Sequence, residues 1–304
     1  MLSCSTCWNS DRHTNGKAML EEILALGFDR VELGHGIRLS LMEGIQKVFD
    51  EGRVTFSSLH NFCPLPIEIT RSSPDCYQFT SHRAQERERA VKLSFQTIDF
   101  AERLGAPFVV LHLGRVPMEH VTSRLLRLTS HGGYLSREFV KMKIKAVKAR
   151  EARAPLYLKR AKECLERIAE YAAAKNIHLG VESRQAYEEV PSERELPDLL
   201  AEINSPYVGY WHDFGHVQIK SNMRFVDHFE WLSKIRGRLL GCHLHDTVWP
   251  GHDHRAPFTG DVDYERLVPL LPENTLFVWE MSPRRKPDEI KESLQRWKQR
   301  FGEK

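Results

Sequence analysis

The chain has 304 residues, of which 41% are hydrophobic, and a net charge of +3. This length is sufficient for a large core, and single α/β barrels commonly exceed roughly 200 residues. The small net charge gives no reason to expect a nucleic acid or an acidic membrane surface as a partner. No run of about 18 apolar residues is present, so we expect no transmembrane span.

The N-terminal segment and the cysteines indicate a cytoplasmic protein. The segment MLSCSTCWNSDRH lacks a basic region followed by an apolar run, so it does not resemble a secretory signal. Six cysteines are scattered along the chain and do not form a disulfide framework. Cys4 and Cys7 form a C-x-x-C, but no second pair completes a four-thiolate zinc site. We therefore expect reduced, structural thiols.

Apolar runs and helix-type periodicity alternate along the whole chain. The expected strands are 2–7, 30–33, 54–60, 107–113, 177–182, 207–212, 238–245 and 275–280. The expected helices are 17–26, 41–50, 81–104, 156–175, 192–203, 224–235, 263–271 and 288–301. Gly27, Gly52 and Gly105 end the first three helices, and Pro287 suits the first turn of the last.

The alternation is interrupted once, after the fourth strand, where residues 114–155 form an additional helical segment. Eight strands, each followed by a helix, predict a single (β/α)₈ TIM barrel over 1–304 with a helical insertion at about 114–155. An open, doubly wound sheet is the alternative. It gives no reason for ligand-type residues on successive strand ends, and its glycine-rich phosphate turn is absent.

Side chains able to bind a metal ion stand at the ends of six expected strands, where the catalytic groups of such barrels gather. They are His60, His112, Glu182, Asp213, His243 and Glu280. A mixture of imidazole and carboxylate suits divalent ions. The last four of these residues can surround one ion, and His60 and His112 can hold a second ion with Glu182 as a bridge.

Other histidines near these strand ends suggest a further site. His216 follows Asp213 by three residues, and the loop containing Asp253 and His254 can complete a third metal site. His245 has the same strand parity as His243, so we expect it to support a ligand or contact the substrate. The remaining histidines outside these motifs are expected to be structural or exposed; they include His13, His35, His82, His120, His131, His178 and His228.

Seven short motifs carry a family resemblance across most of the chain. They are SLHNFCP, VVLHLG, LGVES, HDFGHV, GCHLHDT, DHRAPFTGDVDY and FVWEMS. In this order they resemble the xylose-isomerase-like TIM barrel superfamily, which contains sugar isomerases, sugar epimerases and endonuclease IV-like repair enzymes. The motifs are specific for the superfamily and only weakly specific for a substrate.

The resemblance to the ketose epimerases implies one divalent metal held by Glu182, Asp213, His243 and Glu280. In that group the two glutamates are also the acid–base pair, moving a proton through an enediolate while the metal polarises a sugar oxygen. The implied function is a sugar or sugar-phosphate isomerase or epimerase. Zinc or manganese is the favoured metal, and cobalt, iron or magnesium is compatible with the ligands.

The resemblance to the endonuclease IV-like group implies a different set, a zinc-dependent nuclease acting at apurinic sites. Its three zinc ions would be held by the residues above together with His60, His112, His216 and His254. The loop DHRAPFTGD departs from that pattern, because Arg255 stands where a further loop ligand is wanted. A third possibility is a barrel that binds metal and a sugar without turnover.

Residues near the expected barrel mouth and in the basic segment 137–167 suggest which partners the protein binds. His245, Arg255, Trp8 and Trp249 are expected to contact substrate, since tryptophan faces often stack on sugar rings. Between residues 137 and 167 there are eleven Lys/Arg against four Glu, which indicates a solvated face, a subunit contact or a DNA-backbone contact. Few aromatic residues are interleaved, so a small sugar is favoured over nucleic acid. We expect no membrane contact, and a homodimer is compatible with the family.

Overall fold

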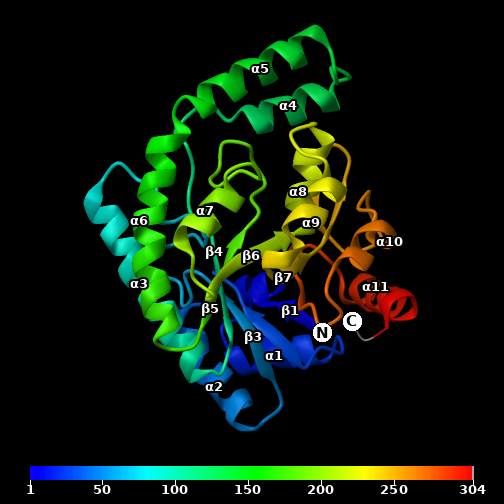
Figure 1. The fold of residues 1–304 in the computed structure, drawn as a ribbon. Helices are drawn as coiled ribbons and strands as arrows, with labels where there is room; N and C mark the ends of the chain where they lie inside the picture. The colour runs from blue at the N-terminus through cyan, green and yellow to red at the C-terminus, as the bar shows by residue number, and fades with distance from the viewer. Residues whose placement is uncertain (303–304) are drawn as a thin grey trace.

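The computed structural model describes residues 1–302 and shows a closed barrel of eight parallel strands (Figure 1). Around the barrel the strand order is β1-β10-β7-β6-β5-β4-β3-β2. The strands are β1 Leu2–Ser5, β2 Arg30–Leu33, β3 Thr55–His60, β4 Phe108–Leu111, β5 His178–Glu182, β6 Val208–Asp213, β7 Leu239–Leu244 and β10 Phe277–Trp279. The predicted TIM barrel is therefore confirmed.

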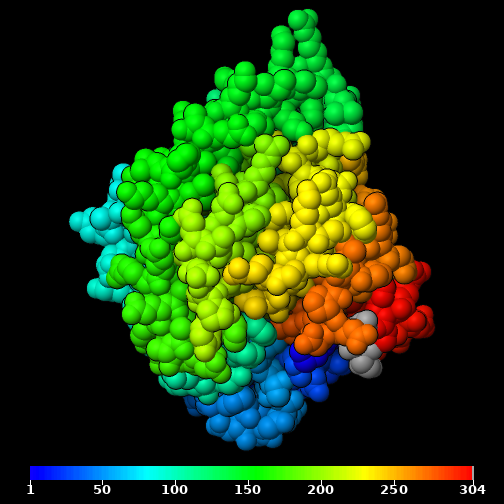
Figure 2. Space-filling model, viewed as in Figure 1, coloured from blue at the N-terminus to red at the C-terminus, as the bar shows by residue number. Residues whose placement is uncertain are grey.

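Eleven helices in the described residues cover the barrel and its carboxyl end. They are α1 Gly16–Leu24, α2 Met42–Asp50, α3 Ala84–Arg103, α4 Val121–Ser130, α5 Arg137–Glu151, α6 Ala154–Ala173, α7 Leu196–Ile203, α8 Phe214–Asn222, α9 His228–Ile235, α10 Tyr264–Leu267 and α11 Pro287–Phe301. The predicted insertion is the α4–α5 hairpin, which projects from the barrel at the top of Figures 1 and 2. None of the described helices is long and apolar enough to cross a membrane.

Two regions after β6 differ from the sequence prediction. The helix expected at 224–235 begins only at His228, and α8, which was not predicted, precedes it. Most of α8 is buried, so its sequence lacks the alternation of apolar and polar faces by which a surface helix is recognised. The second difference is a small antiparallel hairpin after β7, formed by β8 Asp246–Val248 and β9 His252–Arg255. Both strands are too short and polar to show a period of two.

The indole of Trp211 lies in the interior of the barrel, beneath the ends of the strands. Trp211 is fully buried and packs in a cluster with Val110 and Val278. A Cβ at Gly180 would lie 2.8 Å from this indole, and one at Gly241 would lie 2.6 Å from it. These two glycines therefore make room for the ring, which lies edge-on to His243 with 5.5 Å between ring centroids.

The α4–α5 hairpin is attached to the barrel by an apolar contact and a buried ion pair. Val121, Leu125 and Phe139 pack with Met223, which follows α8. The buried Arg150 of α5 donates to Glu195 Oε2 at 2.8 Å and to the carbonyl oxygen of Glu189 at 2.7 Å. One of the basic residues of the 137–167 run is thus a structural anchor and not part of a solvated face.

A chain of buried polar side chains links β6 to α8 and α9. The Tyr210 hydroxyl lies 2.7 Å from His212 Nδ1, His212 Nε2 lies 3.1 Å from His228 Nε2, and His228 Nδ1 lies 2.9 Å from Gln218 Oε1. Burial, together with the facing histidine, lowers the pKa of His212 well below its ordinary value. Burial lowers the pKa of His228 from 6.5 to about 3. Both rings are therefore neutral in the folded protein at neutral pH.

This histidine pair predicts a loss of stability in mild acid. Below pH 6.5 the unfolded chain takes up protons at these histidines that the folded pair does not accept, so the folded state loses stability as the pH falls. We expect the free energy of unfolding of the wild type to fall by about 2 kcal/mol more than that of His228→Gln between pH 7.5 and 5, since one pKa unit corresponds to about 1.4 kcal/mol. Denaturant unfolding at the two pH values measures this, and equal losses in both proteins would contradict it.

Candidate metal centre

The parallel strands carry the predicted ligands to one end of the barrel. His60 ends β3, Glu182 ends β5 and Asp213 ends β6, while Glu280 directly follows β10. In the sheet register Asp213 lies opposite His243 of β7. The carboxyl ends of barrel strands surround a single mouth, so residues far apart in the sequence meet there. Each of these side chains is buried.

Glu182, Asp213, His243 and Glu280 form one group whose ligand atoms all lie within 4.8 Å of one another. The Nδ1 atom of His243 is 3.3 Å from Glu182 Oε1, 3.4 Å from Glu280 Oε2 and 3.9 Å from Asp213 Oδ2. The four residues that the sequence assigns to one ion are thus brought together, as the geometry of a divalent site requires.

His60 and His112 form a second group with the other oxygen of Glu182. His60 Nε2 lies 3.1 Å and His112 Nε2 lies 2.8 Å from Glu182 Oε2. The ligand atoms of these three residues also lie within 4.8 Å of one another. Glu182 therefore presents one oxygen to each group, the arrangement that a bridging carboxylate has.

Electrostatics keep the carboxylates of the centre ionised. Burial disfavours the Glu182 carboxylate, but the charge of His243 and the contacts with His216 and His60 outweigh it and hold the pKa well below its usual value. Glu280 is buried as well, and the charges of His243 and His254 lower its pKa to about 2. The same carboxylates raise the pKa of His243 despite its burial. The buried carboxylates are thus balanced by the charge of neighbouring imidazoles, a role that a bound cation can take over.

Two buried atoms of the group formed by Glu182, Asp213, His243 and Glu280 make no hydrogen bond within the described residues. They are Glu182 Oε1 and His243 Nδ1, which face each other at 3.3 Å. Buried polar atoms are nearly always satisfied, so a facing pair without partners calls for an explanation. A divalent cation between a carboxylate oxygen and an imidazole nitrogen satisfies both atoms. The donor set therefore fits a bound metal ion.

A third group contains three imidazoles, those of His216, His245 and His254, with nitrogen atoms within 4.8 Å of one another. The His245 and His254 rings are stacked with centroids 4.1 Å apart. His245 Nδ1 accepts the backbone N–H of His254 at 3.0 Å, so its proton is on Nε2, which donates to Asp213 Oδ2 at 3.1 Å. Both nitrogens of His245 are engaged, which favours the expected role in supporting Asp213.

The remaining predicted site residues differ in their burial and in their contacts. Asp253 accepts a hydrogen bond from Gln185 at 2.6 Å, and the Nε of Arg255 is buried without a hydrogen-bond partner in the described residues. Trp8 is fully buried, with the Arg12 guanidinium over its ring. Trp249 is 43% exposed and packs edge-on against Tyr134 of the insertion. Its contact with a substrate remains a prediction.

Sequence reasoning missed Glu32, a fully buried carboxylate on β2. Its oxygens lie 3.1 and 3.2 Å from His243 Nε2, and Oε2 also accepts the Ser58 hydroxyl at 2.7 Å. Glu32 therefore turns Nδ1 of His243 toward the centre, as carboxylates behind metal-binding histidines do. It lies inside its strand and not at the end. The sequence does place this charged residue between the apolar Val31 and Leu33 of an expected strand. Because a buried charge requires a partner, that position could have marked Glu32 as a residue of the site.

His35, which we expected to be structural or exposed, also borders the centre. Its ring centroid lies 5.3 Å from that of His60. Burial and the charge of His60 lower the pKa of His35 to about 4. The Cys7 thiol lies 3.8 Å from His35 Nδ1, and burial raises its pKa. His35 and Cys7 are therefore both uncharged at neutral pH, beside the ligand groups.

The family profile described as "Xylose isomerase-like TIM barrel" matches residues 20–300. The chain belongs to this family.

Solved structures with the same fold include sugar epimerases, all at low sequence identity. A D-tagatose 3-epimerase-like protein superposes with a TM-score of 0.70 at 18% identity, covering 99% of this chain and 98% of that one. A 3-keto-D-glucoside 4-epimerase from E. coli gives 0.69 at 13% identity, with 98% of each chain covered. A D-allulose 3-epimerase from Methylomonas sp., in complex with D-allulose, gives 0.65 at 16% identity, covering 99% and 96%.

A sequence relative is the uncharacterized protein y4fM of Sinorhizobium fredii (strain NBRC 101917 / NGR234). It is 25% identical over 216 residues, which are 71% of this chain. The match spans 58% of the length of that relative.

The contact between Glu32 and His243 predicts a role in metal affinity. Glu32→Gln removes the charge behind His243 and is expected to weaken Mn²⁺ or Zn²⁺ binding by about 10- to 100-fold. Isothermal titration calorimetry on metal-stripped protein measures this. Glu188→Gln is the matched control, because Glu188 is equally buried and accepts from Thr122 instead. Equal affinities in the wild type and Glu32→Gln would show that Glu32 does not act on the metal site.

Proposed function

We propose that this chain is a divalent-metal-dependent sugar or sugar-phosphate isomerase or epimerase. The observation that carries the proposal is the buried group of Glu182, Asp213, His243 and Glu280 at the mouth of the barrel. The solved structures with the same fold, which include D-tagatose 3-epimerase-like and D-allulose 3-epimerase proteins, support the same class of substrate.

These four residues would hold the metal ion, with zinc or manganese favoured by a ligand set of one imidazole and three carboxylates. When bound, such an ion supplies a Lewis acid that stabilises negative charge on a sugar oxygen. His245 holds Asp213 by a hydrogen bond, and Glu32 holds His243, so two of the four ligands are fixed by neighbouring residues. Such support keeps the ligand atoms in position.

Glu182 and Glu280 are the proposed acid–base pair. The low pKa values of both groups leave them as carboxylates at neutral pH, each able to accept a proton. One accepts the proton from the carbon next to the sugar carbonyl, giving an enediolate. The other first takes up a proton from water and then delivers it to that carbon or its neighbour. Arg255, with its buried unpartnered Nε, is a candidate contact for a polar group of the substrate.

An endonuclease IV-like nuclease is the second candidate, favoured by the additional ligand groups. His60, His112 and Glu182 can hold another ion, and the group of His216, His245 and His254 is next to Asp213. Both ring nitrogens of His245 already make hydrogen bonds. Within the third group, only His216 and His254 therefore have a nitrogen that could bind an ion. Three zinc ions are therefore less well supported than one or two ions.

Metal content distinguishes the candidates. After mild dialysis the isomerase proposal predicts about one tightly held divalent ion per chain by elemental analysis, and Asp213→Asn is expected to lose most of it. Three zinc ions together with nicking of an abasic duplex would favour the nuclease. A chain that retains no metal and regains none on titration would contradict both.

Proton transfer is tested by isotope exchange. With D-allulose, D-tagatose and D-fructose as probes in D₂O, the wild type is expected to incorporate deuterium at the carbon next to the carbonyl of at least one ketose. Glu182→Gln should reduce this exchange by about 100-fold or more, since positioned acid–base groups contribute roughly that much. Glu188→Gln should retain it. Unchanged exchange in a metal-loaded Glu182→Gln protein would exclude Glu182 as the base.

A further inference from the structure

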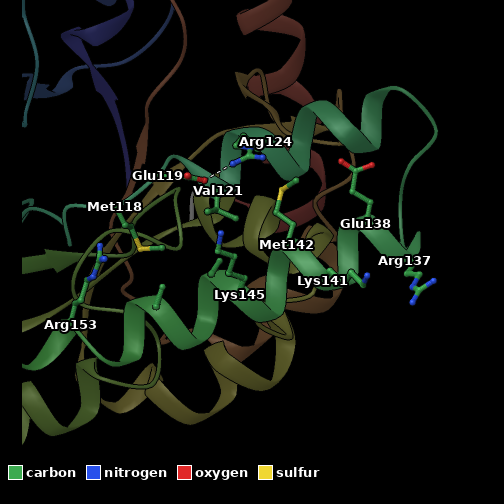
Figure 3. Close-up of a pocket in the computed structure, with 12 residues that line it drawn as sticks. Met118, Glu119, Val121, Arg124, Arg137, Glu138, Lys141, Met142, Lys145 and Arg153 are labelled. Carbon is green, nitrogen blue, oxygen red and sulfur yellow. Dashed lines mark hydrogen bonds and ion pairs between the residues drawn. The ribbon is translucent and has the colours of Figure 1, made fainter.

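A groove outside the barrel lies between α4 and α5 of the insertion, with a cavity volume of about 810 Å³ (Figure 3). Its floor is apolar and is formed by Met118, Val121, Met142, Ala146 and Ala149. Met118, Val121, Met142 and Ala146 also belong to the apolar cluster that contains Met223 and Phe225 from the segment after α8. The hairpin therefore packs on that segment and leaves a groove between its two helices.

The rim of this groove is strongly basic. Five cations line it, against two carboxylates, Glu119 and Glu138; the cations are Arg124, Arg137, Lys141, Lys145 and Arg153. Glu119 is already paired with Arg124. Within the part of the chain that the structure describes, Arg137, Lys141 and Lys145 have no carboxylate at ion-pair distance. Figure 3 shows Lys145 and Met142 pointing from α5 into the space between the two helices.

We propose that this groove docks an acidic amphipathic helix of a partner protein. An apolar floor between two helices is completed by a third helix that inserts its apolar face, the helix-in-groove mode of recognition. Two methionines in the floor adapt to different apolar side chains. Carboxylates flanking the apolar face of the partner would meet Lys141 and Lys145. From Arg137 to Arg153 α5 and its continuation span about 24 Å, the length of a helix of roughly 16 residues.

The lining favours a peptide over other anionic partners. None of the twelve lining residues is aromatic, so the groove offers no stacking surface for the bases of a nucleic acid. A phosphodiester backbone would contact the cations and leave the apolar floor without a partner. The floor also lies between two helices, where a flat lipid surface does not reach it. An acidic amphipathic helix satisfies the floor and the rim together along the length of the groove.

The test uses the full chain and a fluorescein-labelled peptide of 16 residues, with leucines spaced to form one helical face and glutamates on both flanks. Fluorescence anisotropy is expected to show saturable binding that weakens between 50 and 200 mM NaCl. The double variant Lys141→Glu/Lys145→Glu should weaken binding at least tenfold. Lys148→Glu, on the same helix but outside the groove, should change it less than twofold, and circular dichroism confirms that each variant is folded.

The proposal is overturned if a scrambled peptide of the same composition binds equally well, if the double variant binds like the wild type, or if no binding is found. A different partner would also overturn it. That would be the outcome if the wild type bound phosphatidylserine vesicles or a DNA duplex more tightly than the peptide, and if the double variant lost that binding. Metal content and isotope exchange should be unchanged in the double variant, because the groove contains no residue of the ligand groups.

Discussion

The carboxylate of Glu182 is the group on which the arrangement of the barrel mouth depends. It is almost completely buried, and imidazoles from β3, β7, α8 and the end of β4 lie within 3.3 Å of its two oxygens; they are His60, His243, His216 and His112. A buried charge is tolerated only when it is paired, so this carboxylate requires its neighbours to be held in place. Trp211 beneath the site and Glu32 behind His243 provide part of that support.

The sequence was sufficient to predict the barrel and to place the candidate ligand residues at one end of it, for a physical reason. Parallel strands buried on both faces are continuous apolar runs, and their carboxyl ends meet, so Glu182 and His243 could be placed together without coordinates. Glu32 could not be found by the same rule because it lies within a strand. The helix α8 was missed because burial on several sides removes its periodicity.

The role of His245 shows a different limit of sequence reasoning. Strand parity placed its side chain on the same side as that of His243, but parity does not reveal hydrogen bonds. The backbone N–H of His254, on the hairpin after β7, fixes the protonation of the His245 ring and directs its other nitrogen to Asp213. This contact depends on how a polar loop folds back over the mouth. The same loop geometry limits the ligands available to a third ion.

The insertion after β4 contains both a buried, structural basic residue and basic residues that line an open groove. The amino-acid composition of the segment does not distinguish between them. Arg150 is buried in an ion pair with Glu195 and attaches the hairpin to the barrel. Lys141 and Lys145 line an open groove instead. The barrel therefore carries a candidate metal centre at its mouth and, on the insertion, a separate basic groove.

We propose that one divalent ion lies between Glu182, Asp213, His243 and Glu280. Anomalous X-ray diffraction from crystals of manganese-loaded protein, collected near the metal absorption edge, locates such an ion. We expect a strong anomalous peak within bonding distance of Nδ1 of His243 and of oxygens of the three carboxylates. A loaded protein whose anomalous peaks all lie away from these four side chains would contradict it.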